Sequence, residues 1–240
     1  MNIKSTRDQI IHYNKFGWVL INDRNISKII LDIKKEFVSK YRKKFTEEVD
    51  HNRNLIKRLS GDPLISNLFS SKKFTKKIST ICNISKPIFC GPIVTHYTSN
   101  DKTGNSYGLP FHQDYPSMAS SRNSIICWFN LSNSSIKSHG IELVQGSHKS
   151  NIFKGKITNQ GYLVKDAELI NFENIIPKIK LGEVLIFSSF LVHRTYVNPE
   201  FKGWKLSFSL RFDDLENNQW KEKKFISAYQ TTVDRRLFLD

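Results

Sequence analysis

The sequence predicts a mainly β fold, a barrel or jelly roll, backed by a helical N-terminal third. Up to about residue 85, apolar side chains recur at helical spacing. From Ile88 onward the apolar runs become short, rich in β-branched and aromatic residues, and separated by turn residues. Several short strands with turn signals between them are typical of barrels and jelly rolls. Because no linker is visible, we expect one domain, with helical support at 1–85, a β core at 86–215 and a C-terminal extension at 216–240.

The helical third is predicted to contain three helices and one strand. Ser5 or Thr6 can cap the first helix, and Gly17 suits its end. The apolar residues 18–21 then predict a short buried strand. Pro63 suits the first turn of the third helix. The predicted helices cover residues 5–16, 25–48 and 63–81, and residues 51–62 are ambiguous.

The β-rich part is predicted to hold six strands. They cover residues 88–97, 124–131, 141–144, 178–180, 184–187 and 205–212. The segment 150–174 shows no regular pattern and is long for a plain loop. Loops of that length in compact domains are often lids or binding loops. We therefore expect an irregular segment of the length that lids and binding loops have.

The chain is strongly basic, with 37 Lys and Arg against 22 Asp and Glu and a formal charge of +15. One interpretation is an anionic partner, such as nucleic acid, a phosphorylated or CoA-linked substrate, or a charged sugar. The basic residues form only short clusters, however, and no nucleic-acid module is recognisable. We favour a simple compositional bias, with an anionic small substrate as the alternative, and expect nucleic acid not to be the partner.

The three cysteines argue against a disulfide framework or a Cys-based zinc site. Cys82, Cys90 and Cys127 are odd in number and show no Cys-x-x-Cys spacing. The N-terminus is polar, unlike a signal peptide, and no apolar run is long enough to cross a bilayer. A cytoplasmic protein without a membrane partner is the expectation; the oligomeric state cannot be read.

Three side chains could form a metal site. His112 and Asp114 are two residues apart, so in an extended strand both side chains leave the same face. His193 follows the apolar run 184–187 and could close the site from another strand. Two His and one carboxylate with open positions opposite are the ligand set of non-haem Fe(II) oxygenases. A His-x-Asp pair alone is often an exposed strand pair, and a lone His is often a core residue.

Further motifs follow in a fixed order along the chain and resemble the phytanoyl-CoA dioxygenase family. The resembling segments are 13–21, 112–116, 124–131, 140–149, 182–187 and 193–199. The resemblance implies a double-stranded β-helix of cupin-like type, Fe(II), O₂, and 2-oxoglutarate as co-substrate. It places His112, Asp114 and His193 on the iron ligands. It also implies that Gln113 and Trp128 contact 2-oxoglutarate.

A second group of residues concerns the distal carboxylate of 2-oxoglutarate. Thr195 matches a family Ser or Thr that helps to hold the co-substrate. The family usually has an Arg about eleven residues past the distal His, but here Lys205 and Ser207 stand one residue further on. Arg211 follows on the same strand face. A Lys can neutralise a carboxylate but lacks the two-pronged grip of Arg. We favour Lys205 with Ser207 and keep Arg211 as the alternative.

The function implied is hydroxylation of an unactivated C–H bond of a small organic substrate, with conversion of 2-oxoglutarate to succinate and CO₂. Halogenating relatives replace the carboxylate ligand by a small residue; because Asp114 is intact, hydroxylation, desaturation or ring closure is favoured. Two alternatives stay open: a cupin-like metal protein without 2-oxoglutarate turnover, suggested by Lys205, and a basic nucleic-acid-binding protein. Arg194 is expected to point away from the iron, and His96 to be a surface or core residue.

Overall fold

The computed structural model describes residues 5–99, 108–118, 120–158 and 161–217. Its α-helices are α1 Thr6–Phe16, α2 Arg24–Glu36, α3 Val49–Ser60, α4 Pro63–Ser70, α5 Lys72–Cys82 and α6 Tyr115–Met118. Its strands are β1 Trp18–Ile21, β2 Pro87–Thr98, β3 His112–Gln113, β4 Ile125–Asn130, β5 Gly140–Val144, β6 Gly155–Thr158, β7 Gly161–Val164, β8 Asn174–Ile175, β9 Val184–Ser188, β10 His193–Tyr196 and β11 Lys205–Asp214.

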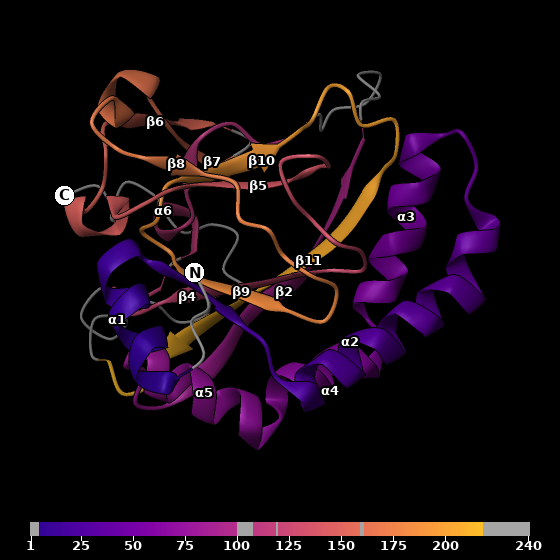
Figure 1. Cartoon of the computed structure of the whole chain (residues 1–240), viewed down its shortest axis with the longest axis horizontal. Coiled ribbons are helices and arrows are strands. Elements are labelled where there is room, and N and C mark those ends of the chain that lie inside the picture. The colour runs from indigo at the N-terminus through magenta and orange to yellow at the C-terminus, as the bar shows by residue number, and fades with distance from the viewer. Residues whose placement is uncertain (1–4, 100–107, 119, 159–160, 218–240) are drawn as a thin grey trace.

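The strands form two antiparallel sheets that face each other (Figure 1). One sheet has the order β1-β9-β4-β11-β2 and the other the order β6-β7-β3-β10-β5-β8. Side chains of both sheets pack together between the layers, for example Trp128 and Leu185 with Ile141 and Leu143. Two packed antiparallel sheets joined in this order form a jelly roll, so the predicted double-stranded β-helix is confirmed.

Helices α2 to α5 cover the outer face of the five-stranded sheet (Figure 1). Isoleucines of α2 and aromatic side chains of α4 and α5 bury against alternate residues of β4, β9 and β11. On β4, Cys127 and Phe129 face the helices, while Ile126 and Trp128 face the space between the sheets. Because side chains alternate along a strand, one strand supplies both the helix-packing core and the wall of an internal site.

The helical third departs from its prediction at two places, and most of the ambiguous segment 51–62 belongs to a further helix, α3. The second helix ends at Glu36 and continues as a π-helical turn, Phe37–Tyr41, and a 3-10 turn, Arg42–Lys44. This irregular end lets Phe37 pack edge-on against Phe45, with 5.5 Å between the ring centroids. The predicted helix over 63–81 is two helices, because the Ser71 hydroxyl accepts from the Phe74 amide and starts a new helix.

The expectation of an irregular segment at 150–174 is wrong. Strands β6 and β7 pair there, and β7 pairs with β3, so this segment extends the six-stranded sheet. Residues 178–180 were predicted as a strand but form only an isolated bridge, Ser134 to Ile179. The short strands β3 and β10 escaped prediction because neither His112–Gln113 nor His193–Tyr196 carries an apolar run. The C-terminal extension lies outside the described residues from 218 on.

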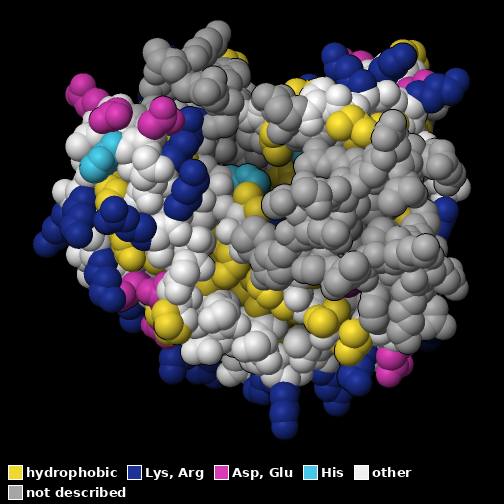
Figure 2. All heavy atoms as spheres, turned by 180° about the vertical axis from the view of Figure 1, so that it is seen from behind, with side chains coloured by type: hydrophobic (Ala, Val, Ile, Leu, Met, Phe, Trp, Pro, Cys, Tyr) yellow, Lys and Arg dark blue, Asp and Glu magenta, His cyan; other side chains and the backbone are white. Residues whose placement is uncertain are grey.

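The lysines and arginines of the described residues can be followed on the face opposite to that of Figure 1. Figure 2 shows lysine and arginine side chains spread around the outline of this face. No helix among the described residues has the length and apolar character needed to cross a membrane. The three cysteines are buried, free thiols.

Candidate active site

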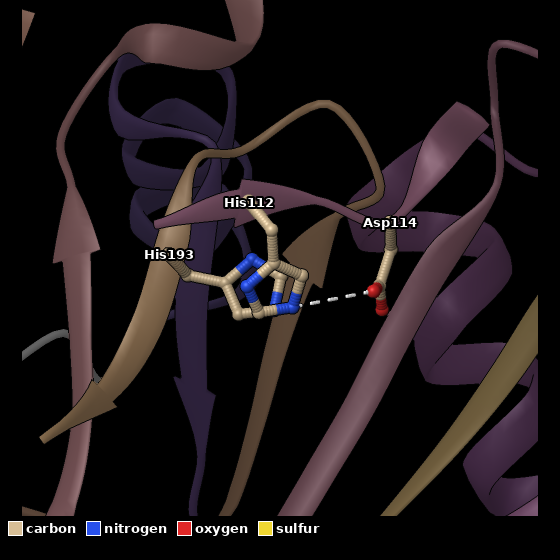
Figure 3. Close-up of side chains that lie close together, drawn as sticks. All are labelled: His112, Asp114 and His193. Carbon is tan, nitrogen blue, oxygen red and sulfur yellow. Dashed lines mark ion pairs between the residues drawn. The ribbon is translucent and has the colours of Figure 1, made fainter. Parts of the chain in front are cut away.

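Two histidines and one aspartate meet between the sheets (Figure 3). Strands β3 and β10 are neighbours, and His112 and His193 are directly opposite in register, with 4.1 Å between the ring centroids. Asp114 follows β3 immediately and turns its carboxylate to the same point. One donor atom from each side chain lies within 4.8 Å of the other two. All three residues are buried.

Backbone carbonyls hold both imidazoles in the tautomer that a metal requires. His112 Nδ1 lies 2.8 Å from the Pro110 carbonyl oxygen, and His193 Nδ1 lies 2.9 Å from that of Leu191. A carbonyl oxygen only accepts, so each Nδ1 carries the proton and each Nε2 lone pair is left for a ligand. His112 Nε2 and Asp114 Oδ1 are 3.6 Å apart, the dashed line of Figure 3, which is too long for a hydrogen bond. These donors converge on a shared space, as a metal site needs.

The charge states of two ligands also suit a cation. Burial raises the pKa of the Asp114 carboxyl, but the Arg211 guanidinium and the nearby imidazoles outweigh this and hold it at about 2. Burial, together with the His112 imidazole, lowers the pKa of His193 to about 3. At neutral pH the site therefore presents an ionised carboxylate and a neutral imidazole. These are the forms that bind Fe(II).

Four further residues predicted from the sequence line the cavity around this triad. Trp128 comes from β4, Thr195 from β10, and Ser207 and Arg211 from β11. The Thr195 hydroxyl accepts a hydrogen bond from the Leu109 amide at 3.0 Å and can still donate its own hydrogen. The cavity therefore brings together an indole, two hydroxyls and a guanidinium beside the metal ligands.

Gln113, which was expected to contact 2-oxoglutarate, turns its side chain away from the cavity in this structure. Its side chain leaves the strand on the opposite face from His112, because neighbouring strand residues alternate. Gln113 Nε2 donates to the carbonyl oxygens of Asn151 and Phe190 at 2.8 and 2.7 Å. Gln113 Oε1 accepts from the Phe153 amide at 3.0 Å. The fully buried amide joins the ligand strand to two loops and does not face the cavity.

The two candidate cations for the distal carboxylate lie at different places. Lys205 is 2% exposed, and its ammonium donates to the Asn133 carbonyl at 3.1 Å and to Ser138 Oγ at 3.4 Å, outside the cavity wall. Burial lowers the pKa of Lys205 to about 7. Arg211 lines the cavity, and its Nη2 lies 3.4 Å from Asp114 Oδ2. The favoured partner, Lys205, therefore does not touch the cavity in this structure, whereas Ser207 does.

Sequence reasoning missed His96, which lines the cavity from β2. Its Nε2 lies 2.9 Å from Ser209 Oγ, and burial lowers the pKa of the imidazole to about 4. The strand had been predicted, but which of its faces turns inward depends on pairing with β11. Arg194, expected to point away from the iron, donates to Glu142 Oε2 at 2.6 Å and also lines the cavity.

Comparisons with known proteins agree with this site. The family model "Phytanoyl-CoA dioxygenase (PhyH)" matches residues 25–199. The solved epimerase SnoN, in complex with Fe3+, alpha ketoglutarate and nogalamycin RO, is 14% identical (TM-score 0.57; 87% of this chain and 83% of that chain). EctD from S. alaskensis with 2-oxoglutarate and 5-hydroxyectoine is 14% identical, with a TM-score of 0.60 over 89% of this chain and 77% of that chain. AviO1 from Streptomyces viridochromogenes Tue57 is 10% identical, with a TM-score of 0.62 over 90% of this chain and 98% of that chain. No curated protein sequence matches the chain.

Proposed function

Because the chain belongs to the phytanoyl-CoA dioxygenase family and is an Fe(II)- and 2-oxoglutarate-dependent oxygenase, we propose that it hydroxylates an unactivated C–H bond of a small organic molecule. One oxygen atom of O₂ enters the new hydroxyl group and the other enters succinate, as 2-oxoglutarate loses CO₂. The observation that carries the proposal is the convergence of the His112, Asp114 and His193 donor atoms. The intact carboxylate of Asp114 favours hydroxylation over halogenation.

The triad would hold the iron through the two Nε2 atoms and one Asp114 oxygen. Bound Fe(II) with 2-oxoglutarate supplies the oxidising power that activates O₂ and breaks a C–H bond. The Pro110 and Leu191 carbonyls keep the imidazoles oriented, and Arg211 keeps the carboxylate of Asp114 ionised. The chain's own contribution is thus to fix three ligands and leave the remaining positions open.

The distal carboxylate of 2-oxoglutarate is proposed to bind Thr195, Ser207 and Lys205. Thr195 and Ser207 are hydroxyls on facing walls of the cavity. Lys205 precedes Ser207 by two residues on β11, and among the described residues no carboxylate lies within ion-pair distance of its buried ammonium. A rotation of its flexible side chain would exchange two uncharged partners for a carboxylate. Arg211 suits this role less well, because it already contacts the metal ligand Asp114.

Apolar and aromatic walls complete the cavity. Ile126 and Trp128 of β4, Phe187 of β9 and Ile141 of β5 line it. Such walls exclude water, which strengthens the electrostatic contacts inside and protects the reaction from side paths. Trp128 is proposed to lie against 2-oxoglutarate. The remaining apolar surface is available to hydrocarbon parts of the substrate.

The substrate is proposed to be a small molecule, because the site is an internal cavity between two sheets. Solved proteins of this fold carry such ligands, nogalamycin RO in SnoN and 5-hydroxyectoine in EctD. The buried free thiols Cys82, Cys90 and Cys127 support a reducing compartment, the cytoplasm, as the place of work.

The test is succinate release from 2-oxoglutarate with added Fe(II), compared between the wild type and His112→Ala. We expect release only from the wild type. Under anaerobic conditions, 2-oxoglutarate added to the Fe(II) protein should also produce a visible absorption band. If the wild type bound no iron, the proposal would be withdrawn.

A pair of variants tests the assignment of the distal carboxylate. Lys205→Met should raise the KM for 2-oxoglutarate by about 10- to 100-fold, because removing one partner of a desolvated charge pair costs roughly 2 kcal/mol or more. Arg211→Met should change that KM far less. The opposite ranking would assign the distal carboxylate to Arg211.

A further inference from the structure

Among the polar side chains of the cavity that hold neither the iron nor, as proposed above, 2-oxoglutarate, three lie together: His96, Ser209 and Arg211. Ser209 and Arg211 face the cavity because β11 alternates, with even-numbered apolar residues packed beneath the helices. His96 on β2 reaches the same wall, where its Nε2 lies 2.9 Å from Ser209 Oγ. The three side chains therefore form one polar wall beside the triad.

The Arg211 guanidinium makes few hydrogen bonds for a largely buried charged group. Its side chain is 22% exposed, and the only carboxylate within 4 Å of it among the described residues is Asp114. A single nitrogen makes that contact, at 3.4 Å, whereas charge-assisted hydrogen bonds are usually about 2.7–2.9 Å. A guanidinium has five N–H donors. Arg211 thus has capacity to bind a second anion from the cavity side.

With Fe(II) and 2-oxoglutarate bound, the site would carry a net charge of one positive unit, which favours binding of one more anion. Iron brings two positive charges, and Arg211 and Lys205 bring one each. Asp114 and 2-oxoglutarate together supply three negative charges, so one positive charge stays uncompensated. Buried charge without a partner is costly. A singly charged group on the substrate would bring the sum to zero; this step rests on the proposed function.

We propose that Arg211, Ser209 and His96 bind a carboxylate of the primary substrate, which is therefore an organic acid. The planar fork of Arg matches the two oxygens of a carboxylate, and the neighbouring hydroxyl can donate to one of them. Because Arg211 touches the metal ligand Asp114, a carboxylate bound there lies beside the iron site. The oxidised C–H bond then belongs to one of the first few carbons next to the carboxylate, and the apolar walls take the rest of the molecule.

A matched pair of probes tests the carboxylate site without the natural substrate. Butanoate and butanamide have the same size and differ in charge. Each is titrated by calorimetry into anaerobic protein loaded with Fe(II) and saturating 2-oxoglutarate. The wild type should bind butanoate about tenfold or more tightly than butanamide, because a desolvated charge pair contributes at least this much. Arg211→Met should lose the preference, Arg211→Lys should keep part of it, and the exposed control Lys149→Met should keep all of it.

The absorption band of the Fe(II) and 2-oxoglutarate complex is recorded first and separates the outcomes. A band in the wild type and in Arg211→Met, with acid preference in the wild type only, supports the carboxylate site. Equal binding of acid and amide by the wild type, or a preference that persists in Arg211→Met, overturns it and leaves the proposed function standing. A band lost only in Arg211→Met also overturns it, since Arg211 would then belong to the iron or 2-oxoglutarate site. No band in the wild type removes both.

Discussion

Replacing Lys205 by Met should stabilise the ligand-free protein at and below neutral pH. The lysine is 2% exposed, its two partners are uncharged, and burial lowers its pKa from 10.5 to about 7. One pKa unit corresponds to about 1.4 kcal/mol, so the buried charge costs the folded state up to about 5 kcal/mol below pH 7. Losing two hydrogen bonds costs about 1 kcal/mol each. The net gain for Lys205→Met is therefore about 3 kcal/mol.

The pH dependence of this difference follows from linkage. Between pH 7 and 10.5 the unfolded lysine keeps a proton that the folded lysine releases, so the free energy of unfolding of the wild type rises with pH. In Lys205→Met this contribution is missing. The advantage of the variant should therefore be largest at pH 6.5 and should shrink steadily as the pH approaches 10.

Urea denaturation at pH 6.5 and pH 9.5 measures both quantities. For a chain of this size about 3 kcal/mol also corresponds to a rise in Tm of roughly 6–12 °C. Lys149→Met removes an exposed lysine and serves as the matched control, with an expected change near zero. The reasoning is refuted if Lys205→Met is no more stable than the wild type at pH 6.5, or if its advantage is the same at both pH values.

Three other predictions concern the site and its surroundings. Gln113→Ala leaves the Asn151 and Phe190 carbonyls and the Phe153 amide without their partner, so we expect a loss of about 2–4 kcal/mol in urea denaturation; a raised KM for 2-oxoglutarate in folded protein would contradict the structural role. The free energy of unfolding of the metal-free protein should fall as the pH drops from 6.5 toward 4. Folded His96 and His193 stay neutral in this range, with pKa values of about 4 and about 3, while the unfolded histidines bind protons. His96→Gln should reduce the dependence of the unfolding free energy on pH, and an unchanged dependence would count against burial of His96 as its cause. Chelation of the metal should abolish succinate release and added Fe(II) should restore it, whereas activity that survives a strong chelator would show that the His112 and Asp114 site is not the source.

Elements with a long hydrophobic pattern were predicted from the sequence more often than elements with a short one. An apolar repeat or run predicted the helices α1, α2, α4 and α5 and the strands β2, β4, β9 and β11. Helix α3 lies mostly within residues 51–62, which stayed ambiguous. The π-helical end of α2 and the break at Ser71 were missed, because both depend on local packing and capping rather than on a repeat. The β6–β7 pair was missed because its strands are short and its partner β3 is shorter still.

The site shows the same division at the level of single residues. The spacing of His112 and Asp114 predicts that both side chains share a face, and it equally predicts that Gln113 does not. The role that the resemblance implies for Gln113, contact with 2-oxoglutarate, conflicts with this alternation. His96 carried no signal of its own, because its position opposite Ser207 is a property of the pairing between β2 and β11.

By itself, the sequence determined the fold class, the family and the three metal ligands, since each depends on residue types at short spacing or on motifs in a fixed order. Only the tertiary structure decided which side chains share the cavity with those ligands: His96 and Arg211 face it, and Gln113 and Lys205 do not. The physical reason is that strand pairing and packing of the helices choose which face of each strand turns inward. That choice depends on contacts between residues far apart along the chain.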